Sequence, residues 1–485
     1  MVSNGEDPAG LTRRRFLGQS ALGLGALAMM SLLDERLFAE SPVTANPDPL
    51  APKPPHFPAK AKRVIYLNMT GAPSQLDMLD YKPKLVEMHL EKIPASVIAG
   101  QRFSTMTDLK GELKVLGPNW PFRQAPGTDQ WFTELMPRFP EILGEITLIK
   151  SMQTDEVNHV PAQLLMSSGS PRMGRPTMGS WVTYGLGTEN RNFPGYVVLT
   201  SGKAGRCGTI CWGSGFMPSV YQGVPFRSSG DPVLHLSNPE GLDDGMRRAS
   251  LDAVRDLNGI ALQAMGDPEI ASRISAYEMA YRMQTSVPEL MDLSKEPPET
   301  LKAYGAEPGK GSFANNCLLA RRLIERGVRF VQLDHGGWDH HGGGDQNLVS
   351  ELPKHCKWVD APSVALVQDL KQRGLLDDTL VIWGGEFGRS AIMQGVYSKE
   401  NLGRDHLRAA FTWWMAGGGI KKGFTLGKTD DFGMNVVEDP IHVHDMQATI
   451  LHCLGLEHTK LTYRFQGRDF RLTDVHGKVV EKLLA

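Results

Sequence analysis

The chain has 485 residues, and its 52 Lys and Arg side chains nearly balance its 54 Asp and Glu side chains. This balance provides neither the basic field that attracts nucleic acid nor the acidic excess of a disordered chain, so small polar or anionic substrates remain open. The length suits one large α/β domain with insertions or two smaller domains.

The first 45 residues predict an export signal. Three consecutive arginines in Thr12–Leu17 precede an apolar stretch, Ala21–Leu33. This order resembles a twin-arginine signal, and the stretch is shorter than the roughly 20 residues that cross a bilayer. We expect cleavage at Val43–Ala45, export by the Tat machinery to the periplasm or the outside of the cell, and no stable membrane span in the mature chain. A cytoplasmic amphipathic leader and an uncleaved signal are the alternatives.

Residues 46–62 predict a linker, because six prolines between Asn46 and Pro58 oppose regular structure and stiffen the chain. Residues 63–485 then form the folded domain. There, short apolar runs alternate with helical patterns, which is typical of a parallel sheet flanked by helices. We predict an α/β fold with a doubly wound, mostly parallel sheet.

The expected strands and helices are short apolar runs and amphipathic stretches. The strands are Val64–Met69, Ile146–Lys150, Tyr196–Leu199, Val328–Leu333, Leu380–Trp383 and Phe411–Ala416. The helices are Pro161–Ser167, Leu251–Ala264, Glu269–Met283, Ala314–Glu325, Pro362–Gly374 and Asp445–Leu454. Cys207–Asn238 is rich in Gly, Ser and Pro, and it predicts an extended excursion that shapes a substrate mouth.

Five cysteines are too few for a disulfide scaffold in a chain of this length. Cys207 and Cys211 are close enough in sequence to form a local disulfide in an oxidising compartment, and no second pair suggests a zinc site. We interpret the cysteines as structural.

The first expected strand runs into a loop with Thr70, Ser74 and Asp77. Either hydroxyl is a candidate nucleophile. Loops also carry Ser and Thr because these residues favour turns, so a purely structural role is the alternative for both.

His159 stands before the expected helix Pro161–Ser167, and we rank it as a second-tier site residue. Asp445 opens the last expected helix, where an N-cap role is the better interpretation.

The most informative segment is Asp334–His341, which follows the fourth strand and contains five metal-capable side chains. Parallel sheets bind ligands beyond the carboxyl ends of their strands, and imidazole with carboxylate is a usual ligand set for zinc and related cations. A glycine-rich surface turn is the alternative.

Two further segments place similar groups near the same edge. Glu386 and Arg389 follow the fifth strand, and Asp405 and His406 precede the sixth. A guanidinium such as Arg389 can bind a tetrahedral oxyanion through two donors, which suits a phosphate or sulfate ester. Surface ion pairing and structural hydrogen bonding are the alternatives.

Several short motifs together resemble the exported bacterial family called domain of unknown function 1501. They are Met69–Asp77, Asn158–Ala162, Arg175–Gly185, Gly336–His341, Gly385–Arg389 and Gly403–His406. That family is similar to the alkaline phosphatase and sulfatase superfamily, and the resemblance runs from about Arg63 to the end of the chain.

The resemblance implies a doubly wound fold with a divalent-metal centre that acts on sulfate or phosphate esters. It implies that Asp339, His341 and His406 bind one divalent metal, for which zinc, calcium and magnesium are the alternatives, and that Glu386 stands where a second metal's carboxylate would be. Asn68 replaces the superfamily's usual Asp, and Phe387 replaces a usual His. The formylglycine context of sulfatases is also missing.

Two functions follow. The first is an exported metal-dependent hydrolase in which Arg389 orients the anion and Thr70, Ser74 or a metal-activated water attacks a small-molecule or polysaccharide ester. The second is a non-catalytic exported binding or assembly protein that retains the fold. The sequence favours the enzyme.

Overall fold

The computed structural model describes residues 48–104, 111–203, 205–228, 230, 232–233, 237–238, 240–394, 397–398 and 401–485. The expected signal, residues 1–45, lies outside the described residues, and the expected linker is described only from Asp48 onward. The division into signal, linker and domain stays a prediction. Among the described helices, none has the length and apolar character needed to cross a membrane.

The described residues form a central sheet of nine strands. In spatial order the strands are β12 (Phe424–Leu426), β4 (Ile146–Gln153), β11 (Phe411–Ala416), β8 (Thr379–Gly384), β1 (Arg63–Thr70), β7 (Phe330–Gly336), β5 (Tyr196–Gly202) and β6 (Val224–Phe226), and β15 (Ile441–His442) pairs with β4. Only β11 in this sheet runs against its neighbours. The mostly parallel sheet is confirmed, and it contains all six expected strands.

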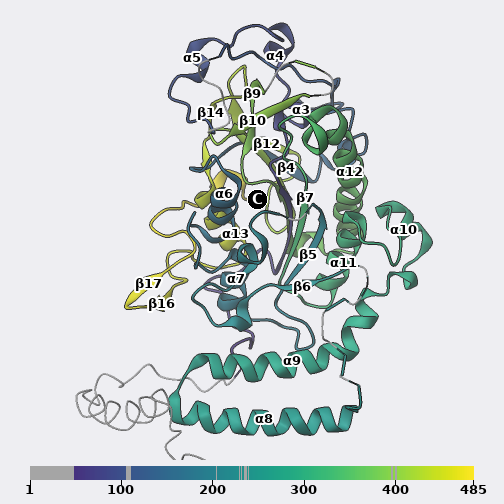
Figure 1. Ribbon diagram of the computed structural model, residues 1–485, viewed down its shortest axis with the longest axis vertical. Coiled ribbons are helices and arrows are strands. Elements are labelled where there is room, and N and C mark those ends of the chain that lie inside the picture. Colours follow the sequence, from purple (N-terminus) through teal and green to yellow (C-terminus); the bar gives the residue numbers. More distant parts are fainter. Residues whose placement is uncertain are drawn as a thin grey trace, which may run out of the picture. The chain divides into compact units, whose positions relative to one another are not determined.

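Helices cover both faces of the sheet, which confirms the doubly wound arrangement (Figure 1). One layer contains α11 (Phe313–Glu325) and α12 (Leu348–Gln372); the other contains α6 (His159–Ser168), α7 (Met178–Leu186) and α13 (Val443–Cys453). Because both faces are covered, the strands are continuous buried runs: seven of the eight residues of β1 are buried. This explains why apolar runs in the sequence located the strands.

Two long helices, α8 (Asp244–Met265) and α9 (Pro268–Met291), run side by side (Figure 1). Both extend beyond the expected ranges. Asp243 and Asp267 accept hydrogen bonds from the first turns of α8 and α9, and Gly266 ends α8 at a φ of +66°.

The remaining elements are short. The helices are α3 (Gln75–Met78), α4 (Pro83–Glu87), α5 (Ala95–Ile98) and α10 (Pro298–Tyr304). The strand pairs are β2 (Phe122–Gln124) with β3 (Trp131–Thr133), β9 (Gly388–Gln394) with β10 (Gly403–Leu407), β13 (Lys428–Thr429) with β14 (Val436–Glu438), and β16 (Tyr463–Phe465) with β17 (Arg468–Phe470). The expected excursion Cys207–Asn238 contains the 3-10 turns η4 (Gly208–Trp212) and η5 (Ser219–Tyr221) as well as β6.

The starts of α12 and α13 differ from the prediction in the residue that caps or begins the helix. Helix α12 begins at Leu348, with Asn347 as its cap, so Pro362 lies inside the helix and not at its start. The buried stripe of α12 continues on both sides of Pro362, and this burial offsets the hydrogen bond that a proline cannot donate. Helix α13 is capped by His442, while Asp445 is the third helical residue and accepts from the His442 backbone N–H in a capping box.

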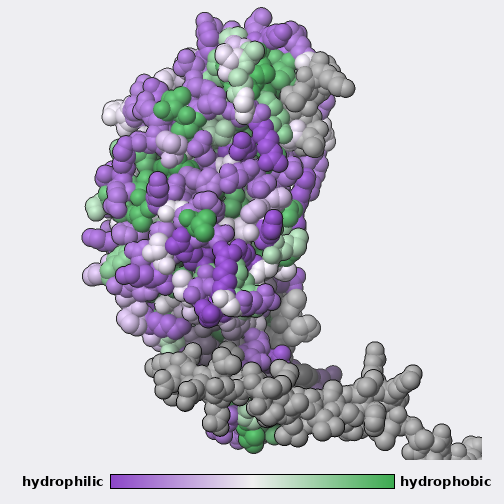
Figure 2. All heavy atoms as spheres, turned by 90° about the vertical axis from the view of Figure 1, so that its left-hand side faces the viewer, coloured by the Kyte–Doolittle hydropathy of each residue, from purple (hydrophilic) through white to green (hydrophobic). Residues whose placement is uncertain are grey.

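The side of the molecule that carries the β16–β17 hairpin is mainly hydrophilic (Figure 2). Hydrophobic residues on this face form small separate groups, which is ordinary for a solvated surface. The apolar residues are concentrated instead in one large core around the sheet, where Trp383, Trp413 and Trp414 are fully buried.

A buried ion pair joins the β9–β10 hairpin to the short helix α3, which follows β1. The Arg404 guanidinium donates to both oxygens of Asp77, at 2.6 and 3.1 Å, and both side chains are fully buried. Arg404 also donates to the carbonyls of Leu116 and Gly117, and Ser74 donates to Asp77. The pair is therefore surrounded by hydrogen bonds that a buried charge requires.

Replacing Asp77 by Asn should destabilise the protein by about 3–5 kcal/mol, because the Arg404 charge would stay buried without its counter-ion. Urea unfolding measures this loss. The exposed pair Lys84–Glu87 provides the control: Lys84→Ala should change the free energy of unfolding by no more than about 0.5 kcal/mol. Equal effects from the two variants would contradict the role of the buried pair.

Candidate metal centre

Three loops meet at the carboxyl edge of the sheet because their strands are parallel neighbours. In the pairing of β1 with β7, Thr70 lies opposite Gly336, and in that of β1 with β8, Asn68 lies opposite Gly384. The chain segments after these strands therefore emerge together. Gly71, at a φ of +109°, allows close contact: a Cβ there would lie 2.8 Å from the backbone nitrogen of Asp339.

Four side chains converge at this edge: His159, Asp339, His341 and His406. One potential ligand atom of each lies within 4.8 Å of those of the others. The Nε2 atoms of His341, His159 and His406 lie 2.8, 2.9 and 3.5 Å from Oδ1 of Asp339. The structure thus brings together three of the four expected metal ligands and adds His159.

Each of the three imidazoles is oriented through its Nδ1 atom. The acceptors are Oε1 of Glu386 for His159, at 2.6 Å, the carbonyl of Val157 for His406, at 2.7 Å, and Oε1 of Gln394 for His341. An oxygen acceptor at Nδ1 can accept a hydrogen bond from a proton there, so that Nε2, which contacts Asp339 in this structure, would be available to bind a cation, as in metal-binding histidines. Three imidazole nitrogens and one carboxylate oxygen fit a divalent cation.

Burial opposes ionisation of Asp339, but Arg389 and hydrogen bonds from the histidines outweigh it and hold the pKa of Asp339 well below its usual range. Burial lowers the pKa of His406 to about 3, which keeps that ring neutral and able to donate its lone pair. Burial also acts to lower the pKa of His159, yet hydrogen bonds with Asp339 and Glu386 overcome this effect and raise it.

Arg389 supports the cluster and is not a free anion ligand. Its Nη2 lies 2.7 Å from Oδ1 of Asp339, and its other donors reach the carbonyls of Gly71, Ala72 and Arg404. The side chain is 1% exposed. Since these donors are already used, the arrangement differs from the expected grip on an oxyanion.

The two candidate nucleophiles lie in different surroundings. Thr70 lines a small cavity of about 70 Å³ together with His159 and Asp339, and its buried Oγ1 has no hydrogen-bond partner among the described residues. Ser74 is buried, and its hydroxyl donates to Oδ2 of Asp77 at 2.5 Å. The structure therefore brings Thr70 to the centre and uses Ser74 in the Asp77–Arg404 pair.

Glu386 lies beside the group of four and does not belong to it. It is fully buried, and besides holding His159 it accepts hydrogen bonds from the Gly71 backbone N–H at 3.0 Å and from Gln163 at 2.8 Å. These contacts give it the role of orienting His159. Among the described residues, Glu386 belongs to no group of three or more potential ligands that could hold a second metal.

Other expected groups lie outside the cluster. Of the five metal-capable side chains in Asp334–His341, Asp339 and His341 enter it, while His335 and His340 are buried elsewhere. Asp334 accepts from Asn68 at 2.7 Å and from Gln332 at 2.9 Å, and burial raises its pKa to about 6.

Two cationic residues at the cavity were not expected from the sequence. Arg206 donates to Oδ2 of Asp339 at 3.0 Å and is more than half exposed, and Lys203 lines the same cavity. Both lie just after β5, in a segment where no motif distinguishes them from ordinary surface charges. By contrast, the Asn158–His159 motif did contain a signal, and the second-tier rank of His159 was too low.

Residues 61–484 match the sequence model of the family described as "Protein of unknown function (DUF1501)". The chain belongs to this family. The resemblance inferred from the short motifs is thereby confirmed. A search of curated proteins finds no match.

The chain is similar to several solved structures at low identity. A mutant of the alkaline phosphatase from the Antarctic bacterium TAB5, with Mg bound in the M3 site, is 12% identical over 82% of this chain and 99% of that chain, with a TM-score of 0.32. The PsFucS1 sulfatase from Pseudoalteromonas sp. is 10% identical over 82% and 68%, with a TM-score of 0.33. A protein in the alkaline phosphatase superfamily from Vibrio parahaemolyticus is 11% identical over 85% and 71%, with a TM-score of 0.32. These similarities assign no activity to the chain.

The His406→Ala variant should lose most of the metal that the purified protein binds, because one of four converging ligand atoms is removed. Elemental analysis after dialysis against a fixed zinc concentration measures the bound metal. His476→Ala is the control, since His476 is exposed and lies outside the cluster. Undiminished metal in a correctly folded His406→Ala variant would refute the ligand assignment.

Asp334 should make stability depend on pH. Its pKa rises on folding from 3.8 to about 6, so the folded state favours the protonated form. The stabilisation from this proton is complete below pH about 4 and is lost as the pH rises through 6, a change of about 3 kcal/mol. The difference in urea unfolding free energy between wild type and Asp334→Asn, measured from pH 4.5 to 7, should follow this curve. A pH-independent difference would contradict it.

Proposed function

We propose that the chain is an exported metal-dependent hydrolase of sulfate or phosphate esters, active in the periplasm or outside the cell. The observation that carries this proposal is the convergence of His159, Asp339, His341 and His406, with each imidazole oriented through Nδ1. The export part rests on the arginine-containing signal pattern in residues 1–45.

The donor set favours zinc or a similar transition metal over calcium and magnesium. Calcium and magnesium prefer oxygen ligands, whereas three of the four converging ligand atoms are imidazole nitrogens. A cation bound there would polarise an ester oxygen and lower the pKa of water. Buried Arg389 and Glu386 keep the ligands in place.

Residues around the small cavity provide the other requirements for ester hydrolysis. Arg206 and Lys203 line the cavity and pair there with Asp339 and Asp345, and both cations are more than half exposed. They would turn to hold the anionic group that Arg389 is not free to bind. Thr70 is the proposed nucleophile, because its hydroxyl lines the cavity without a partner. Its oxygen would bond to sulfur or phosphorus as the bond to the alcohol breaks, and the hydroxyl proton would leave with the alcohol. Water would then release sulfate or phosphate and restore Thr70.

The test is turnover of 4-nitrophenyl sulfate and 4-nitrophenyl phosphate by the purified protein supplied with Zn²⁺, Mn²⁺, Mg²⁺ or Ca²⁺. One ester should be hydrolysed, and His406→Ala should lower kcat/KM by about 100-fold or more. Thr70→Ser should retain activity that Thr70→Ala loses, and His476→Ala should match the wild type. Metal binding without turnover of either ester would favour the alternative, a non-catalytic binding or assembly protein.

A further inference from the structure

A second, larger cavity of about 420 Å³ adjoins the small one. The two cavities share Thr70, Gln163, Lys203 and Gly205 as lining residues. Its volume lies within the range of about 300–1,000 Å³ that is usual for small-molecule sites. A molecule that reaches the metal centre would therefore have room to extend into this space.

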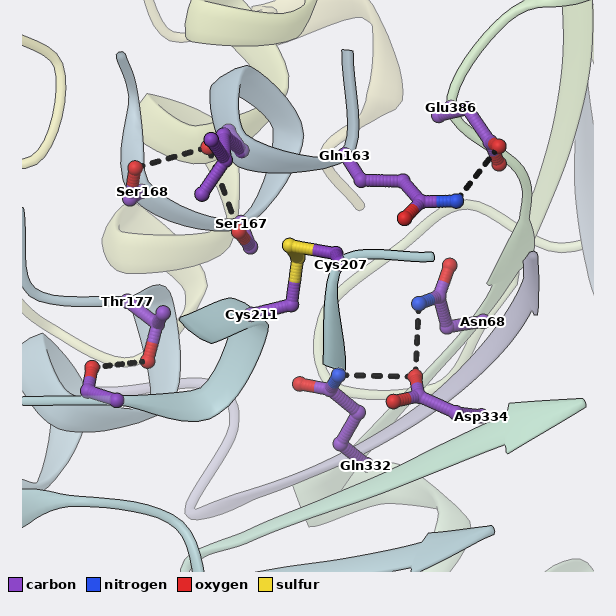
Figure 3. The surroundings of a disulfide bond; sticks show 12 residues. Asn68, Gln163, Ser167, Ser168, Thr177, Cys207, Cys211, Gln332, Asp334 and Glu386 are labelled. Carbon is purple, nitrogen blue, oxygen red and sulfur yellow. Dashed lines mark hydrogen bonds between the residues drawn. A yellow bond between two sulfur atoms is a disulfide. The ribbon is translucent and has the colours of Figure 1, made fainter. Parts of the chain in front are cut away.

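One wall of the large cavity is formed by the Cys207–Cys211 disulfide (Figure 3). Trp212, the residue after Cys211, lines the same cavity. Pro225 of β6 adds a further apolar surface. The disulfide closes a loop of the Gly-rich excursion, and so this excursion does line a pocket next to the candidate centre. These apolar groups can contact a ligand but cannot select for its polar groups.

The inner wall is a set of hydrogen-bond acceptors. Asn68 donates through its amide nitrogen to Asp334 at 2.7 Å, and Gln163 donates through its amide nitrogen to Glu386 at 2.8 Å. These bonds fix which end of each amide faces the carboxylate. The oxygens of both amides then face the space between the two residues, beside the disulfide (Figure 3).

Three of these acceptors have no partner among the described residues: the amide oxygens of Asn68 and Gln163, and Oγ1 of Thr70. All three side chains are more than nine-tenths buried. Asp334 adds a buried carboxylate to the same cavity, and no cationic side chain pairs with it in the described part of the chain. Buried acceptors without donors are unfavourable, so donors are expected to come from a bound molecule.

We propose that this cavity binds the alcohol part of the substrate as a neutral, hydroxyl-bearing ring, a sugar or similar polyol, with Asn68, Gln163 and Asp334 accepting from its hydroxyls. The placement next to the metal centre rests on the proposed function, whereas the binding itself does not. The acceptors belong to side chains from different elements, and hydroxyls spread around a ring can reach separate acceptors, whereas the three donors of an ammonium group share one nitrogen. The apolar face of such a ring fits against Trp212 and Pro225.

Direct binding tests the proposal independently of catalysis. Titration of the purified, zinc-supplied protein with galactose and with lactose, followed by ligand-observed NMR, should show saturable binding of at least one sugar. Asn68→Leu should weaken that binding about tenfold, because one accepted hydrogen bond is lost. Asn192→Leu, at an exposed position outside the cavity, should bind like the wild type.

A comparison of kcat/KM between sugar esters and 4-nitrophenyl esters tests whether the cavity holds the alcohol part of the substrate during hydrolysis. Asn68→Leu should lower kcat/KM for galactose 6-sulfate or galactose 6-phosphate about tenfold and leave the corresponding 4-nitrophenyl ester within twofold. An equal loss for both esters would show a merely structural role for Asn68 and overturn the proposal. Absence of saturable sugar binding, or stronger binding of ethanolamine than of either sugar, would overturn it as well. Sugar binding without ester turnover would refute the proposed function but would still support the sugar-binding role of the cavity.

Discussion

A single carboxylate, that of the partly buried Asp339, holds the carboxyl edge of the sheet together. Removing a carboxylate from water is costly unless charged or polar partners surround it, and the partners of Asp339 come from distant parts of the chain. Arg389 follows β8, His159 begins α6 and His406 lies on β10. The folded chain therefore satisfies Asp339 only when these segments meet, and the candidate metal centre is formed by the same meeting.

A buried ion pair, Arg404–Asp77, determines where one of these segments, the β9–β10 hairpin, lies. Arg404 and Asp77 connect the β9–β10 hairpin to the short helix α3, two residues away from His406 and seven residues after Thr70. Neither side chain belongs to the cluster of four. Their contribution is to set the position of the hairpin, so that His406 presents Nε2 at the correct place. Ser74 takes part in this support, which explains why a hydroxyl that resembled a nucleophile lies apart from the cavity.

Much of the fold could be predicted because buried parallel strands are continuous apolar runs, and the strand-end rule then placed Asp339, His341 and His406 near one another. Features that depend on contacts between distant residues could not be read from sequence patterns. Apolar periodicity does not show that Pro362 is tolerated inside a helix. It also does not show that Arg389 donates its hydrogen bonds to backbone carbonyls. The role of Arg206 depends on where Asp339 lies in space, which no local motif encodes.

The contact between Gly71 and the Asp339 backbone has a consequence for how this site can vary. At this point no side chain lies between the two loops, so main-chain atoms limit how closely they approach. Substitutions in the surrounding walls can accordingly change what the protein accepts while the distance across the centre stays constant. The residues that select the substrate are therefore separate from the main-chain contact that positions the metal centre. Related chains can differ in the substrate they accept while the centre keeps its geometry.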